Sequence, residues 1–162
     1  MANFKKTVGL PKGLKFIPQN SRKIFRYYIG IDTGVNTGLA IWDRSEKKFT
    51  QIECVQIHKA LQIVRDNVED YPDEVMVRVE DARLRKWLPQ SKGTAQLQGA
   101  GSIKRDATIW EHFLVSLNAD FELVAPKNNK TKLAADYFKK LTGWEKATNE
   151  HSRDAAMLVF GQ

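Results

Sequence analysis

Apolar residues gather along the chain in short runs with the spacing of β-strands. Residues 27–32 (YYIGID) and 37–42 (TGLAIW) are apolar runs separated by TGVN, whose Gly and Asn suit a tight turn. Alternation of apolar and polar residues over 49–57 and 75–80 predicts two more strands, and 121–125 (FELVA) predicts a fifth. The pattern therefore predicts five strands, of which the first two form a hairpin.

Helix-spaced apolar residues fall between and after these strands. They predict helices at 58–69, 103–118, 130–141 and 150–160, the last with Asn149 as its N-cap, and they leave 81–102 as a loop. Strands joined by short turns run antiparallel, whereas strands reached through a helix run parallel to the first. We predict an α/β fold, in which three antiparallel strands and then two parallel strands form one sheet with helices on both faces.

The length and charge divide the chain into two parts. The 162 residues suit one domain. The first 26 residues hold seven of the 26 Lys and Arg and none of the 19 Asp and Glu, so the remaining 19 bases balance the acids. We predict a flexible basic arm at 1–26 and a folded domain at 27–162. The arm suits a polyanion, for which nucleic acid is the first candidate, and a tail that only aids solubility is the alternative.

Several classes of protein are excluded by what the sequence lacks. It shows neither a secretory leader nor an apolar run long enough to cross a bilayer. A single cysteine, Cys54, allows no disulfide and no cysteine metal site within one chain. We expect a cytoplasmic protein that is not secreted and has no membrane partner.

Two predicted strands end on carboxylates. Asp32 closes the first strand and Glu80 closes the fourth, and parallel strand ends meet at one edge of a sheet. Carboxylates brought together repel each other unless a cation lies between them, and two Mg²⁺ ions can serve phosphodiester hydrolysis. His151 and Asp154, three residues apart, share a helix face and can add ligands. Alternatively, Asp154 only complements the helix dipole, His151 is a surface residue, and Asp81 replaces Glu80.

These stretches resemble a known family. IGIDTGVNTGLAIW, VRVED and EHSRDAAML, in this order over about residues 27–160, resemble the RuvC-type Holliday junction resolvases of the RNase H-like superfamily. The resemblance implies an RNase H-like fold, a homodimer joined through the 103–118 helix, and a host that is a bacterium or a virus-infected cell. It also implies that two Mg²⁺ ions, replaceable by Mn²⁺, are bound by Asp32, Glu80, His151 and Asp154.

The predicted function is metal-dependent resolution of four-way DNA junctions by paired phosphodiester hydrolysis, which leaves 5′-phosphate and 3′-hydroxyl ends. Gly34 is expected to turn the chain beside Asp32 without crowding the ions. Two alternatives stay open. The first is an RNase H-like nuclease that cuts other branched DNA or RNA–DNA hybrids. The second is a scaffold that binds branched DNA without cutting it.

Basic residues near the strand ends are candidates for phosphate contacts. PKNNKTK is expected to open a helix whose free N–H groups hold a phosphate, although a solvated first turn fits as well. Trp87 in the loop is expected either to stack on an unpaired base or to cover the edge of the core. The predicted DNA-binding residues are Lys104, Arg105, Lys127, Lys130, Lys132, Arg83, Arg85, Trp87 and Arg153.

Overall fold

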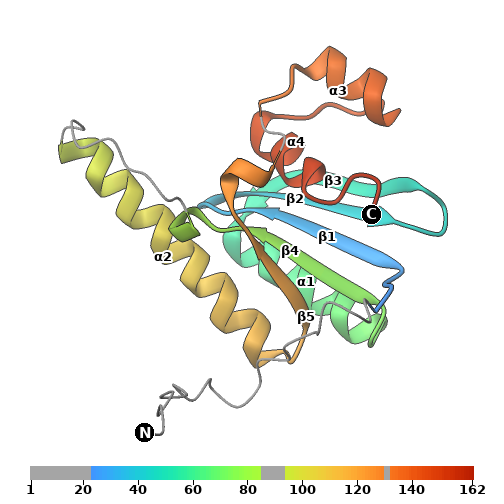
Figure 1. Ribbon diagram of the computed structural model, residues 1–162, viewed down its shortest axis with the longest axis horizontal. Helices are drawn as coiled ribbons and strands as arrows, with labels where there is room; N and C mark the ends of the chain where they lie inside the picture. Colours follow the sequence, from blue (N-terminus) through green and yellow to red (C-terminus); the bar gives the residue numbers. More distant parts are fainter. Residues whose placement is uncertain (1–22, 85–93, 130–131) are drawn as a thin grey trace, which may run out of the picture.

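The computed structural model describes residues 23–84, 94–129 and 132–162 (Figure 1). In these residues the strands are β1 (Tyr27–Asp32), β2 (Asn36–Asp43), β3 (Lys48–Gln56), β4 (Val75–Glu80) and β5 (Asp120–Val124). The helices are α1 (Ile57–Asp70), α2 (Thr94–Ser116), α3 (Ala135–Thr142) and α4 (Glu150–Met157), with short 3₁₀ turns η1 (Ala82–Leu84) and η2 (Pro126–Asn128).

The five described strands form one sheet in the order β3-β2-β1-β4-β5. β1 and β3 both pair antiparallel with β2, while β4 runs parallel to β1 and β5 runs parallel to β4. The prediction of three antiparallel and two parallel strands is confirmed. The order also places β1 in the centre, with β4 beside it.

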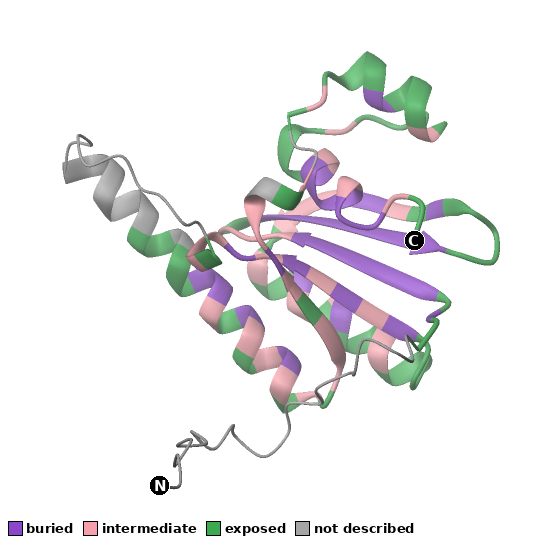
Figure 2. Ribbon diagram, in the orientation of Figure 1, coloured by how far each residue is buried: buried purple, intermediate pink, exposed green. Residues whose placement is uncertain are grey.

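Helices cover both faces of this sheet. α1 and α2 pack on one face over Ile29, Ile31 and Val77, with Trp110 of α2 fully buried. α4 and α3 contribute to a second core on the other face, where Ala155 and Ala156 of α4 meet residues such as Tyr28, Ala40 and Trp42. Figure 2 shows the buried strands and the buried segments along the later part of α2. A strand covered on both faces reads as a continuous apolar run, which explains the sequence YYIGI.

Two helices begin at residues other than those predicted. The loop predicted for 81–102 is wrong over its last part, because α2 already begins at Thr94. Gly99 and Gly101 lie in the stretch predicted as a loop, but a helix tolerates each glycine at a cost of about 1 kcal/mol. A Cβ at Gly101 would meet nothing within 4 Å, so packing does not require this glycine.

α3 begins at Ala135 and not at residue 130, so PKNNKTK does not open a helix. Lys132 has a left-handed backbone, with φ of 61°, which the first turn of an α-helix cannot contain. The final helix ends at Met157, before the predicted residue 160, and the chain continues in a turn. The remaining strand limits lie within one residue of the prediction.

The folded body includes residues that precede β1. Phe25 is buried in the core on the α4 face, and Lys23 pairs with Asp73 and Asp120 at 3.0 and 2.9 Å. The backbone N–H of Arg26 donates to the carbonyl of Glu74. None of the helices in the described part of the chain is both long and apolar enough to span a membrane.

Candidate metal centre

The adjacent ends of β1 and β4 carry the two strand-terminal carboxylates. Ile31 pairs with Val79 in parallel register, so Asp32 and Glu80 come next at the same edge of the sheet. Side chains alternate along a strand, and Asp32 therefore shares the α4 face with Gly30. On β4, Arg78 donates to the carbonyl of Leu158 at 2.5 Å, which places Glu80 on this face too.

Two glycines allow the backbone of α4 to lie directly on the sheet. A Cβ at Gly30 of β1 would lie 2.0 Å from the carbonyl oxygen of Ala155, and a Cβ at Gly38 of β2 would lie 2.0 Å from that of His151. Gly38 pairs with Asp32 in the hairpin, so the start of α4 lies beside that carboxylate. Any larger residue at either glycine would displace the helix that carries His151 and Asp154.

The N-terminus of α4 is fixed by its own side chains. Asn149 accepts a hydrogen bond from the backbone N–H of Ser152 at 2.9 Å, and the Ser152 hydroxyl accepts one from the N–H of Asn149 at 3.1 Å. This reciprocal cap satisfies two amides that the helix leaves free, and it confirms Asn149 as the N-cap. It fixes the first turn, from which His151 extends.

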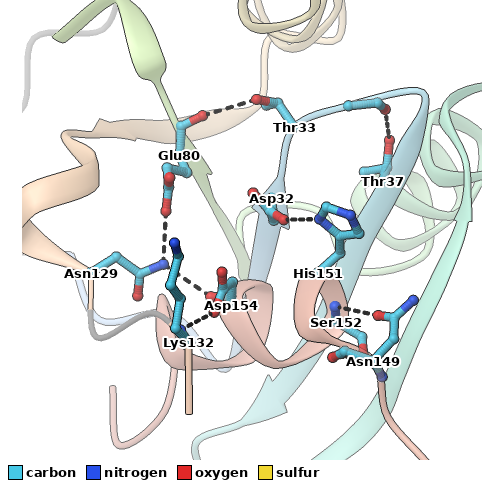
Figure 3. A network of polar contacts seen from close by, with 11 residues as sticks. Asp32, Thr33, Thr37, Glu80, Asn129, Lys132, Asn149, His151, Ser152 and Asp154 are labelled. Atoms are coloured by element: carbon cyan, nitrogen blue, oxygen red, sulfur yellow. Dashed lines mark hydrogen bonds and ion pairs between the residues drawn. The ribbon is translucent and has the colours of Figure 1, made fainter. Parts of the chain in front are cut away.

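Asp32 lies between Glu80 and His151 in the view of Figure 3. Its Oδ2 is 2.8 Å from Nδ1 of His151, and the Asp32 side chain is 16% exposed whereas that of His151 is 55% exposed. Burial, together with the nearby charges of Glu80 and Asp154, raises the pKa of Asp32 to about 6, although the contact with His151 opposes this rise. The surroundings of Asp32 thus disfavour the ionised form of its carboxylate.

The other two carboxylates each accept a hydrogen bond from the segment after β5. Glu80 Oε2 accepts from the amide nitrogen of Asn129 at 2.9 Å, and Asp154 Oδ1 accepts from the backbone N–H of Lys132 at 2.8 Å. Burial also raises the pKa of Asp154, against the effect of the Lys132 hydrogen bond. Figure 3 shows both contacts below and beside Asp32.

This donor set fits a hard divalent cation. Three carboxylates and one imidazole lie near one another, and a cation would offset both the burial and the repulsion that raise the pKa of Asp32. Yet no three His, Cys, Asp or Glu side chains of the described residues stand ready-made in metal-site geometry. Each of the three carboxylates is instead hydrogen-bonded to a protein group: Asp32 to His151, Glu80 to Asn129 and Asp154 to the backbone of Lys132.

Asp81, the alternative to Glu80, belongs to a different cluster. Its side chain is 1% exposed and accepts hydrogen bonds from the Arg83 guanidinium at 2.7 to 3.0 Å. Arg83 also pairs with Glu111 of α2 at 2.7 Å and donates to Thr108 at 3.1 Å. The Asp81 and Glu111 contacts raise the pKa of Arg83 above its ordinary value, against the effect of burial. Asp81 and Arg83 therefore tie the end of β4 to α2.

The predicted DNA-binding residues divide into three groups. Lys104, Arg105 and Lys132 are exposed, although Arg105 lies 3.5 Å from Asp106. Arg153 donates from Nε to the carbonyl of Leu133 at 2.8 Å and from its guanidinium to Thr148, so it braces α4 as Arg83 braces β4. Outside the described part of the chain lie Arg85, Trp87, Lys130 and the side chain of Lys127.

Sequence reasoning missed Gly30, Gly38 and Asn129. A glycine inside an apolar strand is a known sign of close backbone approach, so the two glycines were detectable from the sequence. Asn129 gave no such sign, because its partners are distant in sequence. Gly34 does not need the backbone freedom of glycine in this turn, because its φ is not positive and a Cβ there would meet only the carbonyl of Asn36, at 3.4 Å. Its expected effect on the ions stays a prediction.

Comparison with known proteins gives a likeness to a solved structure. No protein-family model matches the chain, and no curated protein matches it. Among solved structures, RuvC of T. thermophilus in complex with a Holliday junction substrate superposes with a TM-score of 0.53 at 14% sequence identity. The match covers 82% of this chain and 89% of that one. At this identity the likeness concerns the fold, and it agrees with the strand order and the two-sided helix packing. The chain therefore has an RNase H-like fold of the kind found in RuvC.

Proposed function

We propose that this protein is a divalent-metal-dependent, structure-selective endonuclease that resolves four-way DNA junctions by paired phosphodiester hydrolysis. The products are expected to carry 5′-phosphate and 3′-hydroxyl ends. The observation that supports this most is the convergence of Asp32, Glu80, His151 and Asp154 at one edge of the sheet, with the pKa of Asp32 raised to about 6. The RuvC-like fold supports the choice of a junction as substrate.

In this proposal the four residues hold two Mg²⁺ ions, for which Mn²⁺ substitutes. The ions supply the positive charge and the Lewis acidity that hydrolysis of a phosphodiester requires. The protein contributes rigid positions: Asp32 and Glu80 come from strands, and His151 and Asp154 come from a helix seated on those strands. His151, with its half-exposed ring, also gives Asp32 a hydrogen-bonding partner at the edge of the site.

Exposed basic residues near this edge are proposed to contact DNA phosphates. Lys132 adjoins Asp154 through its backbone N–H, so its ammonium group can hold a phosphate near the carboxylates. Lys104 and Arg105 extend the basic surface along α2. Arg83 and Arg153 are used inside the protein, and we propose that they position β4 and α4.

We further propose that the protein acts as a homodimer joined through α2. A four-way junction has approximate two-fold symmetry, so two sites related by a two-fold axis suit two cuts. α2 buries Trp110 against the sheet but leaves Ile109 40% exposed, and its first turns extend beyond the sheet in Figure 1. Ile109→Glu is expected to convert the dimer to a monomer in analytical ultracentrifugation. A dimer that persists in this variant would contradict the α2 interface.

One observation favours a second candidate, a scaffold that binds branched DNA without cutting it. Asp32, Glu80 and Asp154 are each engaged by a protein hydrogen-bonding partner, and no ready-made cation geometry exists among the described residues. A scaffold would need only these contacts, whereas in a nuclease the same carboxylates must also bind ions.

The test is cleavage of end-labelled four-way junction, duplex, flap and RNA–DNA hybrid in Mg²⁺ and in Mn²⁺. The wild type is compared with Asp32→Asn and with Asp70→Asn, an exposed carboxylate on α1, as the matched control. Symmetric nicks in the junction that disappear only in Asp32→Asn are expected. Tight junction binding without cutting would favour the scaffold, and cutting confined to the hybrid would indicate a ribonuclease.

A further inference from the structure

The side chain of Asn129 connects two parts of the metal centre. Asn129 follows η2, and its amide nitrogen donates to Oε2 of Glu80 at 2.9 Å and to the backbone carbonyl of Asp154 at 3.0 Å. An amide nitrogen has two hydrogens, and both are used. One side chain therefore joins the last residue of β4 to the middle of α4, as Figure 3 shows for Glu80.

The orientation of this amide is determined by its surroundings. If it were reversed, Oδ1 would face the Glu80 carboxylate and the Asp154 carbonyl, which are both acceptors. In the observed orientation Oδ1 is buried without a hydrogen-bonding partner. A buried acceptor without a partner is costly. The fold tolerates this cost because the amide nitrogen of Asn129 keeps both of its hydrogen bonds, to Glu80 and to the carbonyl of Asp154.

Glu80 benefits most from this arrangement. Its carboxylate is borne on a longer, more flexible side chain than those of Asp32 and Asp154 and needs more restraint to hold one direction. Asn129 is the one described residue that hydrogen-bonds to this carboxylate. A neutral donor fixes the direction of a carboxylate without neutralising it, and so keeps the charge available to a cation.

We propose that Asn129 is a positioning residue that orients the Glu80 carboxylate for cation binding and is not itself a ligand. This inference rests on the proposed function, because it assumes that Glu80 binds a divalent cation. The neighbouring backbone supports it: the N–H of Lys132 holds Asp154 at 2.8 Å, so two residues of the segment after β5 each hold one carboxylate.

The test is Mn²⁺ binding to the full-length protein without DNA, measured by the decrease of the free-ion electron paramagnetic resonance signal. Asn129→Ala removes the donors, and Asn129→Leu removes them while keeping the bulk of the side chain. Asn128→Ala changes an exposed residue of the same type in the adjoining turn and is the control. Both Asn129 variants are expected to weaken Mn²⁺ binding about ten-fold, and Asn128→Ala is expected to bind like the wild type.

A double-mutant cycle with Glu80→Gln distinguishes an effect of Asn129 through the Glu80 carboxylate from a general disturbance of the structure. In the Glu80→Gln background, Asn129→Ala should weaken Mn²⁺ binding no further, and junction affinity in EDTA should equal that of the wild type in every variant. Wild-type affinity in both Asn129 variants, or an equal loss in the Glu80→Gln background, would overturn the inference. A wild type that binds no Mn²⁺ would overturn it together with the proposed metal centre. Mn²⁺ binding that depends on Asn129, in a protein that cleaves no DNA, would contradict the proposed nuclease activity but not the role of Asn129.

Discussion

Asp32 is a carboxylate in surroundings that resist its charge. Its pKa of about 6 lies above the ordinary value of 3.8, so the folded protein takes up a proton more readily than the unfolded chain does. The stability gained from this proton is complete below pH 3.8 and is lost as the pH rises through about 6. Above about pH 6, the ionised Asp32 lowers the stability of the fold when no cation is bound.

Asp32→Asn is therefore expected to stabilise the cation-free protein. The difference in unfolding free energy between this variant and the wild type should grow between pH 4 and pH 6 and reach about 3 kcal/mol at pH 8. Urea unfolding in EDTA across this range measures the difference. Asp70→Asn serves as the control, and a pH-independent difference for Asp32→Asn would contradict the prediction. A residue that destabilises the fold in the absence of its ligand is typical of functional sites.

Arg83, which was predicted to contact DNA, pairs with acidic side chains inside the protein. It neutralises the buried Asp81 and reaches Glu111 on α2. Arg83→Ala would leave Asp81 charged and unpaired. We expect this to lower the unfolding free energy by about 3 kcal/mol, which is at the low end for a buried ion pair because Arg83 is partly exposed. Urea unfolding checks this, with the exposed Arg44→Ala as control. Unchanged stability with weakened junction binding would restore the predicted contact with DNA.

At the scale of elements, the contact of α4 with β1 and β2 holds the metal centre together. Gly30→Ala would put a Cβ 2.0 Å from a backbone oxygen that cannot rotate away. We expect a loss of about 3 kcal/mol in unfolding free energy and a large loss of Mn²⁺ affinity as α4 is displaced. Gly34→Ala is the matched control, expected to change stability by less than about 1 kcal/mol because its site has room. Equal effects of the two substitutions would contradict the close helix–sheet contact.

The sequence pattern was sufficient for the strands and for the position of two candidate ligands. β1 and β4 are short buried runs that end on a carboxylate, and both properties are local, so Asp32 and Glu80 were found together with their strands. Helix limits were harder to predict. The first part of α2 contains two glycines, which a helix tolerates at some cost. The start of α3 depends on the left-handed Lys132, whose N–H is held by Asp154 from elsewhere in the chain.

The contacts of Arg83 and Asn129 could not be predicted for the same reason. Whether an arginine after a strand reaches DNA or turns back to a buried aspartate depends on the position of α2, which the sequence does not state. Asn129 meets Glu80 across 49 residues of chain. Tertiary contacts of this kind decide which polar residues belong to the site, while local patterns decide only where candidates occur.

At the scale of the whole molecule, most of the excess positive charge lies in residues 1–22 of the sequence. Deleting residues 1–22 removes five bases: Lys5, Lys6, Lys12, Lys15 and Arg22. If these bases bind DNA, the dependence of log K on log salt should flatten by about 0.9 for each phosphate that the shortened protein no longer neutralises. Fluorescence anisotropy of a labelled junction over a salt series measures the slope. An unchanged slope would leave the segment a role in solubility only.

The deletion must stop at residue 22. Removing residues 1–26 would also take Phe25, which is 2% exposed, and Lys23, which pairs with two aspartates. We expect that longer deletion to cost about 3 kcal/mol, since it leaves a cavity in the core. The shorter one should leave the unfolding free energy unchanged.

The seating of the last helix on the first hairpin also determines when the proposed activity can arise. Asp32 and His151 touch across 119 residues, so the metal centre depends on one of the most distant contacts in the chain. Such contacts are slow to form, and a growing polypeptide acquires them last. A ribosome-bound chain that has not yet reached α4 carries the basic segment and every strand of the sheet but lacks half of the ligand set. If the protein cuts DNA as proposed, synthesis itself would keep it inactive until α4 has been made.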